Sequence, residues 1–295
     1  MSWLQLRLDC NKSAAAALEQ ALLDAGALSV TLEDCADQPL LEPGVGETPL
    51  WDAIRITGLF GADHNMDAAL AGLQPLAADA APRIEILEDK DWEREWMQHY
   101  RPMRFGQRLW ICPSWQDPPD AQAVNLLLDP GLAFGTGTHP TTALCLQALD
   151  ADDLAGKRVV DFGCGSGILG IAALKLGARY LLAVDNDPQA LQATAANATR
   201  NSIAETALEL ALPNAYARDT WQHSADLVLA NILAGPLATL SGVLCDLIAP
   251  GGRLILAGLL DTQAEALIAH YSPRIALTIH SQSDDWVCLA GTLSE

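Results

Sequence analysis

Residues 158 to 290 alternate short apolar segments with longer helical ones, and this order constrains the fold more than any other feature of the chain. A helix between successive strands makes the strands parallel and covers both faces of the sheet. The pattern therefore predicts a doubly wound α/β domain. Its strands are expected at Arg158–Phe162, Tyr180–Val184, Leu208–Leu212, Asp226–Ala230 and Arg253–Ala257.

Two more strands are expected at the end of the chain, at Ile275–His280 and Trp286–Ala290, after a helix near Thr262–His270. Only the polar segment Ser281–Asp285 separates them, which is too short for a crossover helix. These strands must therefore pair antiparallel. Such a pair departs from the all-parallel sheet of nicotinamide enzymes and looks like the seven-stranded sheet of class I methyltransferases.

The first 87 residues follow a different order of elements. Leucines at positions 4, 6 and 8 alternate with polar residues as in a half-buried strand, and an alanine-rich helix then ends at Gly26. The β-α-β-β-α-β order predicts a smaller ferredoxin-like α+β domain over residues 1–87. Its expected elements are strands at 4–8, 28–32, 54–59 and 83–87, and helices at 13–25 and 66–73.

A charged, aromatic segment follows at residues 88–104. Trp92 and Trp96 lie four residues apart, which places them on one side of a helix, and Pro102 ends that helix. We expect a helical linker here, with the tryptophans packed against a domain rather than against a ligand. The doubly wound domain then occupies residues 105–295.

The composition argues against several classes of protein. Lys and Arg number 17 against 37 Asp and Glu, so the formal charge of -20 repels phosphate backbones and favours a cationic partner. The acidity could equally serve only to keep the protein soluble. The seven cysteines are scattered and form no C-x-x-C pair, so neither a disulfide framework nor a metal site is expected. No apolar run approaches the roughly 20 residues of a membrane span, and we expect a cytoplasmic protein.

A glycine-rich turn joins the strand at Arg158–Phe162 to a helix that begins near Ile168. Gly163 and Gly165 allow a tight turn and a close approach of a ligand to the main chain, while the helix supplies free N–H groups. Asp161 precedes this turn and is a further candidate cofactor contact. The spacing G-x-G-x-G differs from the G-x-G-x-x-G that a nicotinamide dinucleotide prefers, so a dehydrogenase is disfavoured.

Asp185 ends the next strand, 22 residues after Gly163. A carboxylate at this place can accept hydrogen bonds from both ribose hydroxyls of an adenosine cofactor. Its alternative role is to cap the following helix, but Asp187 followed by Pro188 fills that place. Together with the terminal antiparallel strands, these features favour S-adenosylmethionine as the cofactor, bound beyond the carboxyl ends of the strands.

Asn231 ends the fourth strand and is followed by Ile232, Leu233 and the pair Gly235-Pro236. This segment resembles the Asn/Asp-Pro-Pro-Tyr motif of amino-group methyltransferases, although Ile232 and Leu233 replace the prolines. An amide oxygen can hold an amine by its hydrogens and aim the lone pair at a methyl group. The alternative is a residue of a strand-end turn.

The loop from Asp129 to Thr142 is rich in glycine and hydroxyl groups and precedes the first strand of the catalytic domain. It is typical of an active-site lid that closes over the methionine end of the cofactor, with Thr142 donating to the cofactor's carboxylate. His139 could act as a base or only cap the next helix. The lid also contributes Phe134, Gly135, Thr136 and His139 as candidate cofactor contacts.

The segments Leu128–Thr142, Asp161–Gly167 and Ala230–Pro236, together with Asp185, closely resemble the PrmA family, which methylates large-subunit ribosomal protein eleven. The resemblance covers nearly the whole chain and is strongest in the catalytic domain. It implies a substrate-recognition domain at residues 1–87, and trimethylation of the α-amine and lysine ε-amines of that protein by S-adenosylmethionine. Residue by residue, the family's cofactor contacts match Thr142, Gly163, Asp185 and Asn231, with Asn231 also beside the target amine.

The charge of residues 1–87 agrees with this resemblance. They contain 13 acidic and 4 basic side chains, which is unsuited to RNA and suited to a lysine-rich protein. Two alternatives stay open. One is an RNA or small-amine methyltransferase, and the other is a cofactor-binding module without catalytic activity.

Overall fold

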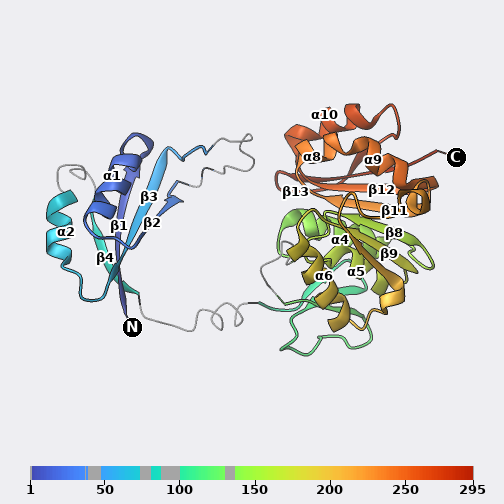
Figure 1. Ribbon diagram of the computed structural model, residues 1–295, viewed down its shortest axis with the longest axis horizontal. Coiled ribbons are helices and arrows are strands. Elements are labelled where there is room, and N and C mark those ends of the chain that lie inside the picture. The colour runs from blue at the N-terminus through green and yellow to red at the C-terminus, as the bar shows by residue number, and fades with distance from the viewer. Residues whose placement is uncertain are drawn as a thin grey trace. The chain divides into compact units, whose positions relative to one another are not determined.

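The computed structural model describes residues 2–36, 38, 48–73, 81–87, 100–129 and 137–294. The chain divides into two compact units, 1–98 and 99–295, which Figure 1 colours from blue to red along the sequence. Within the described residues, no helix is long and apolar enough to cross a membrane.

The N-terminal unit is an antiparallel sheet covered on one face by two helices. Its sheet has the order β2-β3-β1-β4, which is the predicted ferredoxin-like arrangement. Leu6 and Leu8 of β1 and Ile56 of β3 pack against Leu18 and Leu22 of α1 in one buried cluster. The elements are β1 (Trp3–Asn11), α1 (Lys12–Asp24), β2 (Ser29–Asp34), β3 (Ala53–Gly61), α2 (Met66–Leu73) and β4 (Arg83–Leu87).

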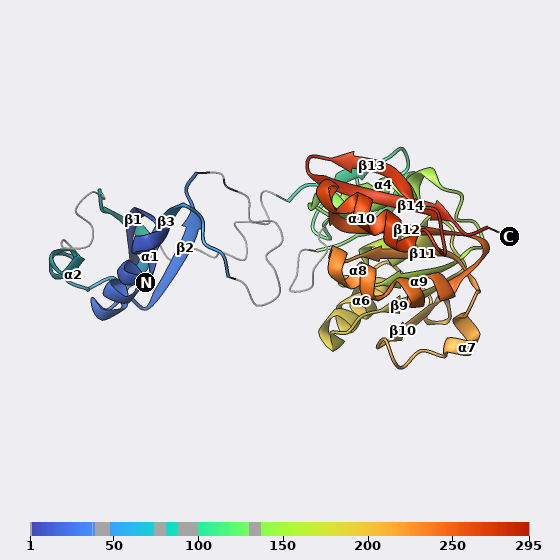
Figure 2. The same ribbon diagram turned by 90° about the horizontal axis from the view of Figure 1, so that it is seen from above.

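The C-terminal unit is built on a seven-stranded sheet of order β10-β9-β8-β11-β12-β14-β13, most of which can be followed across Figure 2. The strands from β8 to β12 are parallel, and β14 is antiparallel to both β12 and β13, so the predicted terminal pair is confirmed. The strands are β8 (Arg158–Phe162), β9 (Tyr180–Val184), β10 (Leu208–Ala211), β11 (Ala225–Asn231), β12 (Ile248–Leu260), β13 (Thr278–Ser283) and β14 (Trp286–Thr292).

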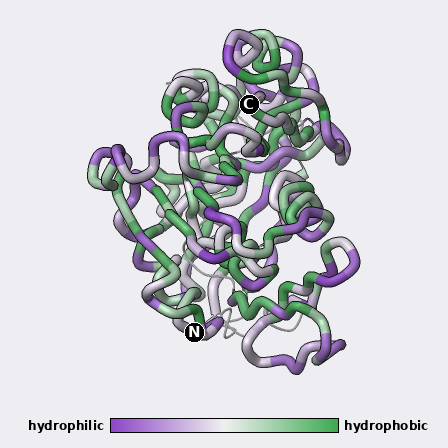
Figure 3. The backbone as a smooth tube through the Cα atoms, turned by 90° about the vertical axis from the view of Figure 1, so that its right-hand side faces the viewer, coloured by the Kyte–Doolittle hydropathy of each residue, from purple (hydrophilic) through white to green (hydrophobic). Residues whose placement is uncertain are grey.

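Helices cover both faces of this sheet. Val159 of β8 faces a core shared with α4, α5 and α6, and the next residue, Val160, faces a core shared with α8, α9 and α10 (Figure 1). Apolar and polar stretches alternate along the unit, as the hydropathy colouring of Figure 3 shows. The helices are α4 (Pro140–Ala151), α5 (Ile168–Lys175), α6 (Pro188–Arg200), α7 (Arg218–Trp221), α8 (Ala234–Thr239), α9 (Ser241–Leu247) and α10 (Asp261–Tyr271), with a 3-10 turn at Glu205–Ala207.

A small second sheet of order β5-β6-β7 precedes α4 and was not predicted. It comprises β5 (Met103–Phe105), β6 (Leu109–Cys112) and β7 (Val124–Leu127). The buried Asp150 of α4 accepts hydrogen bonds from the backbone N–H groups of Gln107 (2.6 Å) and Arg108 (3.0 Å), which fixes the β5-β6 turn. At the other edge, the Asn201 side chain accepts from the Leu127 N–H (2.7 Å) and donates to its carbonyl (2.8 Å).

The linker expected at 88–104, with its helix ended by Pro102, overlaps the small sheet at its last two residues. Met103 and Arg104 belong to β5, because they pair with β6 rather than continue a helix. The rest of that prediction, including Trp92 and Trp96, lies outside the described residues.

Candidate active site

The glycine turn, residues 163–167, follows β8 at the point where the strand order reverses between β8 and β11. The N–H groups of Gly163 and Cys164 both donate to the Val184 carbonyl at the end of β9, at 2.7 and 3.1 Å. Gly163, Gly165 and Gly167 have φ values of +81°, +55° and +78°, which L residues rarely adopt. Gly167 provides no side-chain cap for α5, and in the first turn the Gly170 N–H donates to the Asp161 carboxylate instead.

Two side chains of α6 donate hydrogen bonds to backbone carbonyls of this turn. The sequence analysis missed both of them. Thr194 donates to the Gly165 carbonyl (3.1 Å), and Asn197 donates to the Ser166 carbonyl (2.8 Å). Both side chains are buried. The signal that could have identified them is a pair of polar residues three positions apart on the side of a helix that otherwise buries alanine. The protein's own side chains therefore bond the backbone of the turn without any ligand.

Asp185 connects the turn to the end of β9. One carboxylate oxygen accepts from the Gly165 N–H (2.9 Å) and the other from the Asp187 N–H (3.0 Å). Asp187 itself caps α6 by accepting from Gln189 N–H (2.8 Å), with Pro188 in the first turn, as predicted. Each oxygen of Asp185 keeps a second lone pair, so the half-buried carboxylate can still accept from two vicinal hydroxyls.

Asp161 lies beneath the turn rather than on its surface. It is 1% exposed, and its carboxylate accepts from the Gly170 N–H of α5 (2.9 Å). Burial raises its pKa to about 7, the Asp185 charge adds to the increase, and the bond from Gly170 opposes it. The geometry makes Asp161 a positioning group for α5.

Asn231 and Thr142 come together at the end of β11, although they are 89 positions apart in the sequence. The Asn231 amide nitrogen donates to the Thr142 hydroxyl at 3.3 Å. Thr142 stands in the first turn of α4 and is 3% exposed, whereas Asn231 is half-buried. The bond leaves the Asn231 carbonyl oxygen and the Thr142 hydroxyl hydrogen for other partners.

Two glycines confine the residue that follows Asn231. A Cβ atom at Gly163 would overlap the Cγ2 atom of Ile232, and a Cβ atom at Gly258 would overlap the Ile232 carbonyl. Gly258 has a φ of +88° and lies where the pairing of β12 with β14 is irregular. The sequence analysis missed Gly258, although a glycine inside a strand signals a bulge or a close backbone approach.

His139 caps α4, which is the second of the two predicted roles. Its Nδ1 lies 2.8 Å from the Thr141 hydroxyl and accepts weakly from the Thr141 N–H. The ring packs edge-on against Trp286 at 4.8 Å between centroids, and burial lowers the pKa of the imidazole. The other lid candidates, Phe134, Gly135 and Thr136, lie outside the described residues.

Comparisons with known proteins agree with this geometry. A family model described as Ribosomal protein L11 methyltransferase (PrmA) matches residues 2–294. A ribosomal protein L11 methyltransferase of Teredinibacter turnerae is 51% identical over 298 residues, covering 99% of this chain and 97% of the relative. One from Klebsiella pneumoniae strain 342 is 52% identical and covers 99% of both chains.

Among solved structures, a ribosomal protein L11 methylase from Lactobacillus delbrueckii subsp. bulgaricus is 32% identical with a TM-score of 0.56. That match covers 66% of this chain and 100% of the other. A family match over nearly the whole length and relatives at about half identity leave one assignment. The chain belongs to the PrmA family of S-adenosylmethionine-dependent ribosomal protein L11 methyltransferases.

Proposed function

We propose that this enzyme trimethylates the α-amine and lysine ε-amines of ribosomal protein L11 in the crevice at the carboxyl ends of β8, β9 and β11. The observation that carries the proposal is the convergence there of the glycine turn, Asp185 and the Asn231–Thr142 pair. In an α/β sheet this is the place where ligands bind. We place the reaction in the cytoplasm, without direct binding to RNA or to a membrane.

The residues present fit S-adenosylmethionine. Asp185 would accept from the ribose hydroxyls through the lone pairs that Gly165 and Asp187 leave open. Thr142 would donate its hydroxyl hydrogen to the cofactor's carboxylate, because its oxygen already accepts from Asn231. When bound, the cofactor supplies a methyl group on a sulfonium, which is open to attack by a neutral amine.

Asn231 would orient the target amine. A free lysine has a pKa near 10.4, so about one amine in a few thousand is neutral at pH 7. The carbonyl oxygen of Asn231 can accept a hydrogen from the neutral amine and fix the direction of its lone pair. An uncharged amide does this without stabilising the ammonium form, as a carboxylate would.

Charge supports a protein substrate over RNA. The 13 acidic and 4 basic side chains of residues 1–87 repel phosphate and attract a lysine-rich protein. Two alternatives stay open: an RNA or small-amine methyltransferase, and a cofactor-binding module without turnover. One experiment separates them from the proposal.

Incubation of the purified protein with labelled S-adenosylmethionine and total ribosomal proteins tests the proposal. We expect label on ribosomal protein L11, with mass spectrometry placing trimethyl groups at the N-terminal amine and at lysines. Label in RNA that survives protease digestion would favour an RNA methyltransferase. Cofactor binding by calorimetry without any labelled product would favour the binding module.

A further inference from the structure

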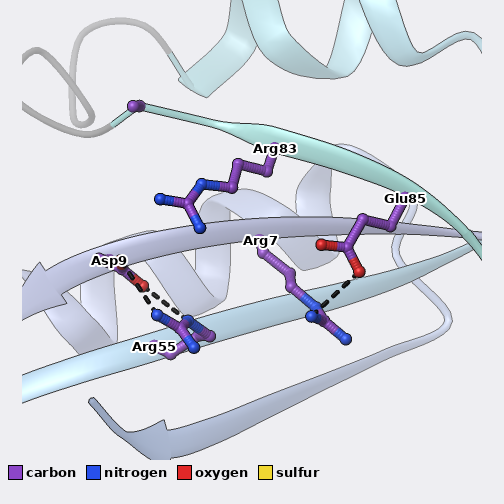
Figure 4. Close-up of a pocket in the computed structure, with 6 residues that line it drawn as sticks. Arg7, Asp9, Arg55, Arg83 and Glu85 are labelled. Atoms are coloured by element: carbon purple, nitrogen blue, oxygen red, sulfur yellow. Dashed lines mark hydrogen bonds and ion pairs between the residues drawn. The ribbon is translucent and has the colours of Figure 1, made fainter.

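The face of the N-terminal sheet opposite α1 and α2 carries three of the four basic residues of segment 1–87. We call Arg7, Arg55 and Arg83 the arginine cluster. They come from β1, β3 and β4 and line a shallow pocket with Asp9 and Glu85 (Figure 4). All three arginines of this acidic segment therefore line one pocket.

Two of the arginines have carboxylate partners within the pocket. Arg55 donates to both oxygens of Asp9 at 2.8 and 3.3 Å, and Arg7 lies 3.0 Å from Glu85. The hydrogen bond from Arg55 lowers the pKa of Asp9. The four side chains are between 36% and 48% exposed, so a partner can still reach them.

Arg83 is the third cation, and it stands directly opposite Arg7 in the register of β1 with β4. Figure 4 draws no interaction from Arg83, and it has no ion pair within the part of the chain that the structure describes. Like charges directly opposite each other on a sheet are destabilising. The pocket therefore holds three positive and two negative charges, with the excess at this pair.

Two polar atoms beside this pair also have no partner. Arg7 Nε and Thr57 Oγ1 are buried without a hydrogen bond among the described residues. Thr57 is 8% exposed and lies opposite Arg7 on β3, so it shares the same face of the sheet. Buried donors and acceptors are normally satisfied. Both atoms are enclosed by the protein, so the group that a ligand can reach at this place is the exposed guanidinium of Arg83.

We propose that Arg83 and Arg7 together receive a carboxylate side chain of the ribosomal protein substrate. The proposal rests on the function proposed above and names one contact of the substrate with the N-terminal domain. A planar guanidinium pairs with a carboxylate through two parallel hydrogen bonds. That carboxylate would neutralise the excess charge between the two opposed arginines.

A protein carboxylate fits better than a phosphate of RNA. The domain as a whole is acidic and repels a polyanion, whereas it attracts a basic protein from a distance. The arginine cluster would act only once the substrate protein touches the domain. One acidic side chain of the substrate, bound to the cluster, would then fix the orientation of the substrate.

Steady-state kinetics of the full-length enzyme with purified ribosomal protein L11 test this contact. In Arg83→Gln we expect KM for the protein substrate to rise at least fivefold, while kcat and the calorimetric affinity for S-adenosylmethionine stay within twofold of wild type. The control is Lys12→Gln, which removes the same charge at the exposed start of α1, outside the pocket. Arg83→Lys should recover only part of the loss, because it keeps the charge without the planar fork.

The acidic partner can be found by neutralising the carboxylates of the substrate one at a time. One such change should raise KM in the wild type and have no further effect in Arg83→Gln. Equal KM values for Arg83→Gln and Lys12→Gln would overturn the contact. A loss of RNA affinity in Arg83→Gln with an unchanged KM for the protein substrate would also overturn it. Since wild-type turnover of the ribosomal protein is measured in the same assay, failure of the contact is distinguished from failure of the proposed function.

Discussion

The glycine turn and the arginine cluster differ in how their polar groups are satisfied. In the turn, Gly165 both donates to Asp185 and accepts from Thr194, and Asn197 donates to the backbone beside it. In the cluster, the Nε atom of Arg7 has no partner among the described residues. The turn is therefore held by the protein's own side chains, whereas the cluster keeps one arginine, Arg83, for the substrate carboxylate proposed above. Changes in the turn should affect the cofactor, and changes in the cluster only the protein substrate.

The largest effect is expected from Gly163→Val. The new side chain would have to adopt a φ of +81° and would overlap Ile232, so the turn must open. We expect affinity for S-adenosylmethionine to fall by about 3 kcal/mol or more in calorimetry. The control is Gly235→Ala in α8, where an added Cβ meets no neighbour among the described atoms within 4 Å. Normal cofactor binding by Gly163→Val would mean that the turn tolerates displacement.

Asp185→Ala should weaken cofactor binding by about 1 to 3 kcal/mol, because the ribose hydroxyls lose a charged acceptor. Asp187→Ala is the matched control. It removes a carboxylate two positions away and should cost about 1 kcal/mol of folding stability as a lost helix cap, with unchanged cofactor affinity. Calorimetry and urea unfolding of both variants separate the two roles. Equal cofactor affinities in the two variants would contradict the ribose role.

Asn231→Ala should lose at least tenfold in kcat, or about 1.4 kcal/mol, from lost orientation of the amine. Asn231→Asp should also be slow, because its charge would hold the proton on the substrate amine. Its activity should recover partly as the pH rises from about 7 to 10, toward the pKa of lysine, while Asn231→Ala keeps the wild-type pH profile. Wild-type rates in either variant would reduce Asn231 to a turn residue.

The smallest effect concerns Asp161, whose pKa in the folded protein is raised to about 7 from 3.8. A raised pKa means that the stability from this carboxyl is fully present below about pH 4 and is lost as the pH rises through about 7. Asp161→Asn cannot ionise and still offers an oxygen to the Gly170 N–H. Relative to wild type, we expect this variant to gain on the order of 1 kcal/mol between pH 5 and 7.5 in urea unfolding. A pH-independent difference would place the pKa of Asp161 in the folded protein below this range.

The sequence predicted the large sheet well, because most of its strands are apolar runs bounded by helices or turn residues; the exception is β13, which is mostly polar. The small sheet was missed for a physical reason: its strands have three or four residues, and its stability depends on Asp150, 43 positions from the N–H of Gln107. At the C-terminal end, β13 begins at Thr278 rather than at the predicted Ile275. Ile275 is apolar because it is buried in the core that α8, α9 and α10 share, although it lies before the strand.

The residues proposed for the site could be named from the sequence, but the contacts between them could not. Asp185, Asn231 and Thr142 follow from their places at strand ends and in the lid, yet the bond between Asn231 and Thr142 depends on the folded sheet. The same holds for the opposition of Arg7 to Arg83, which exists only in the register of β1 with β4. Sequence patterns give faces and ends of elements, whereas register and long-range packing decide which side chains meet.

The side chain of Asn201 affects whether β7 can pair with a strand of another molecule. Val124 and Leu128 donate their N–H groups toward β6, so the N–H and carbonyl of Leu127 point out of the free side of β7. An open strand edge of this kind can recruit a strand from another chain and start aggregation. Asn201 occupies both groups of Leu127, so its amide stands where the backbone of a foreign strand would otherwise pair.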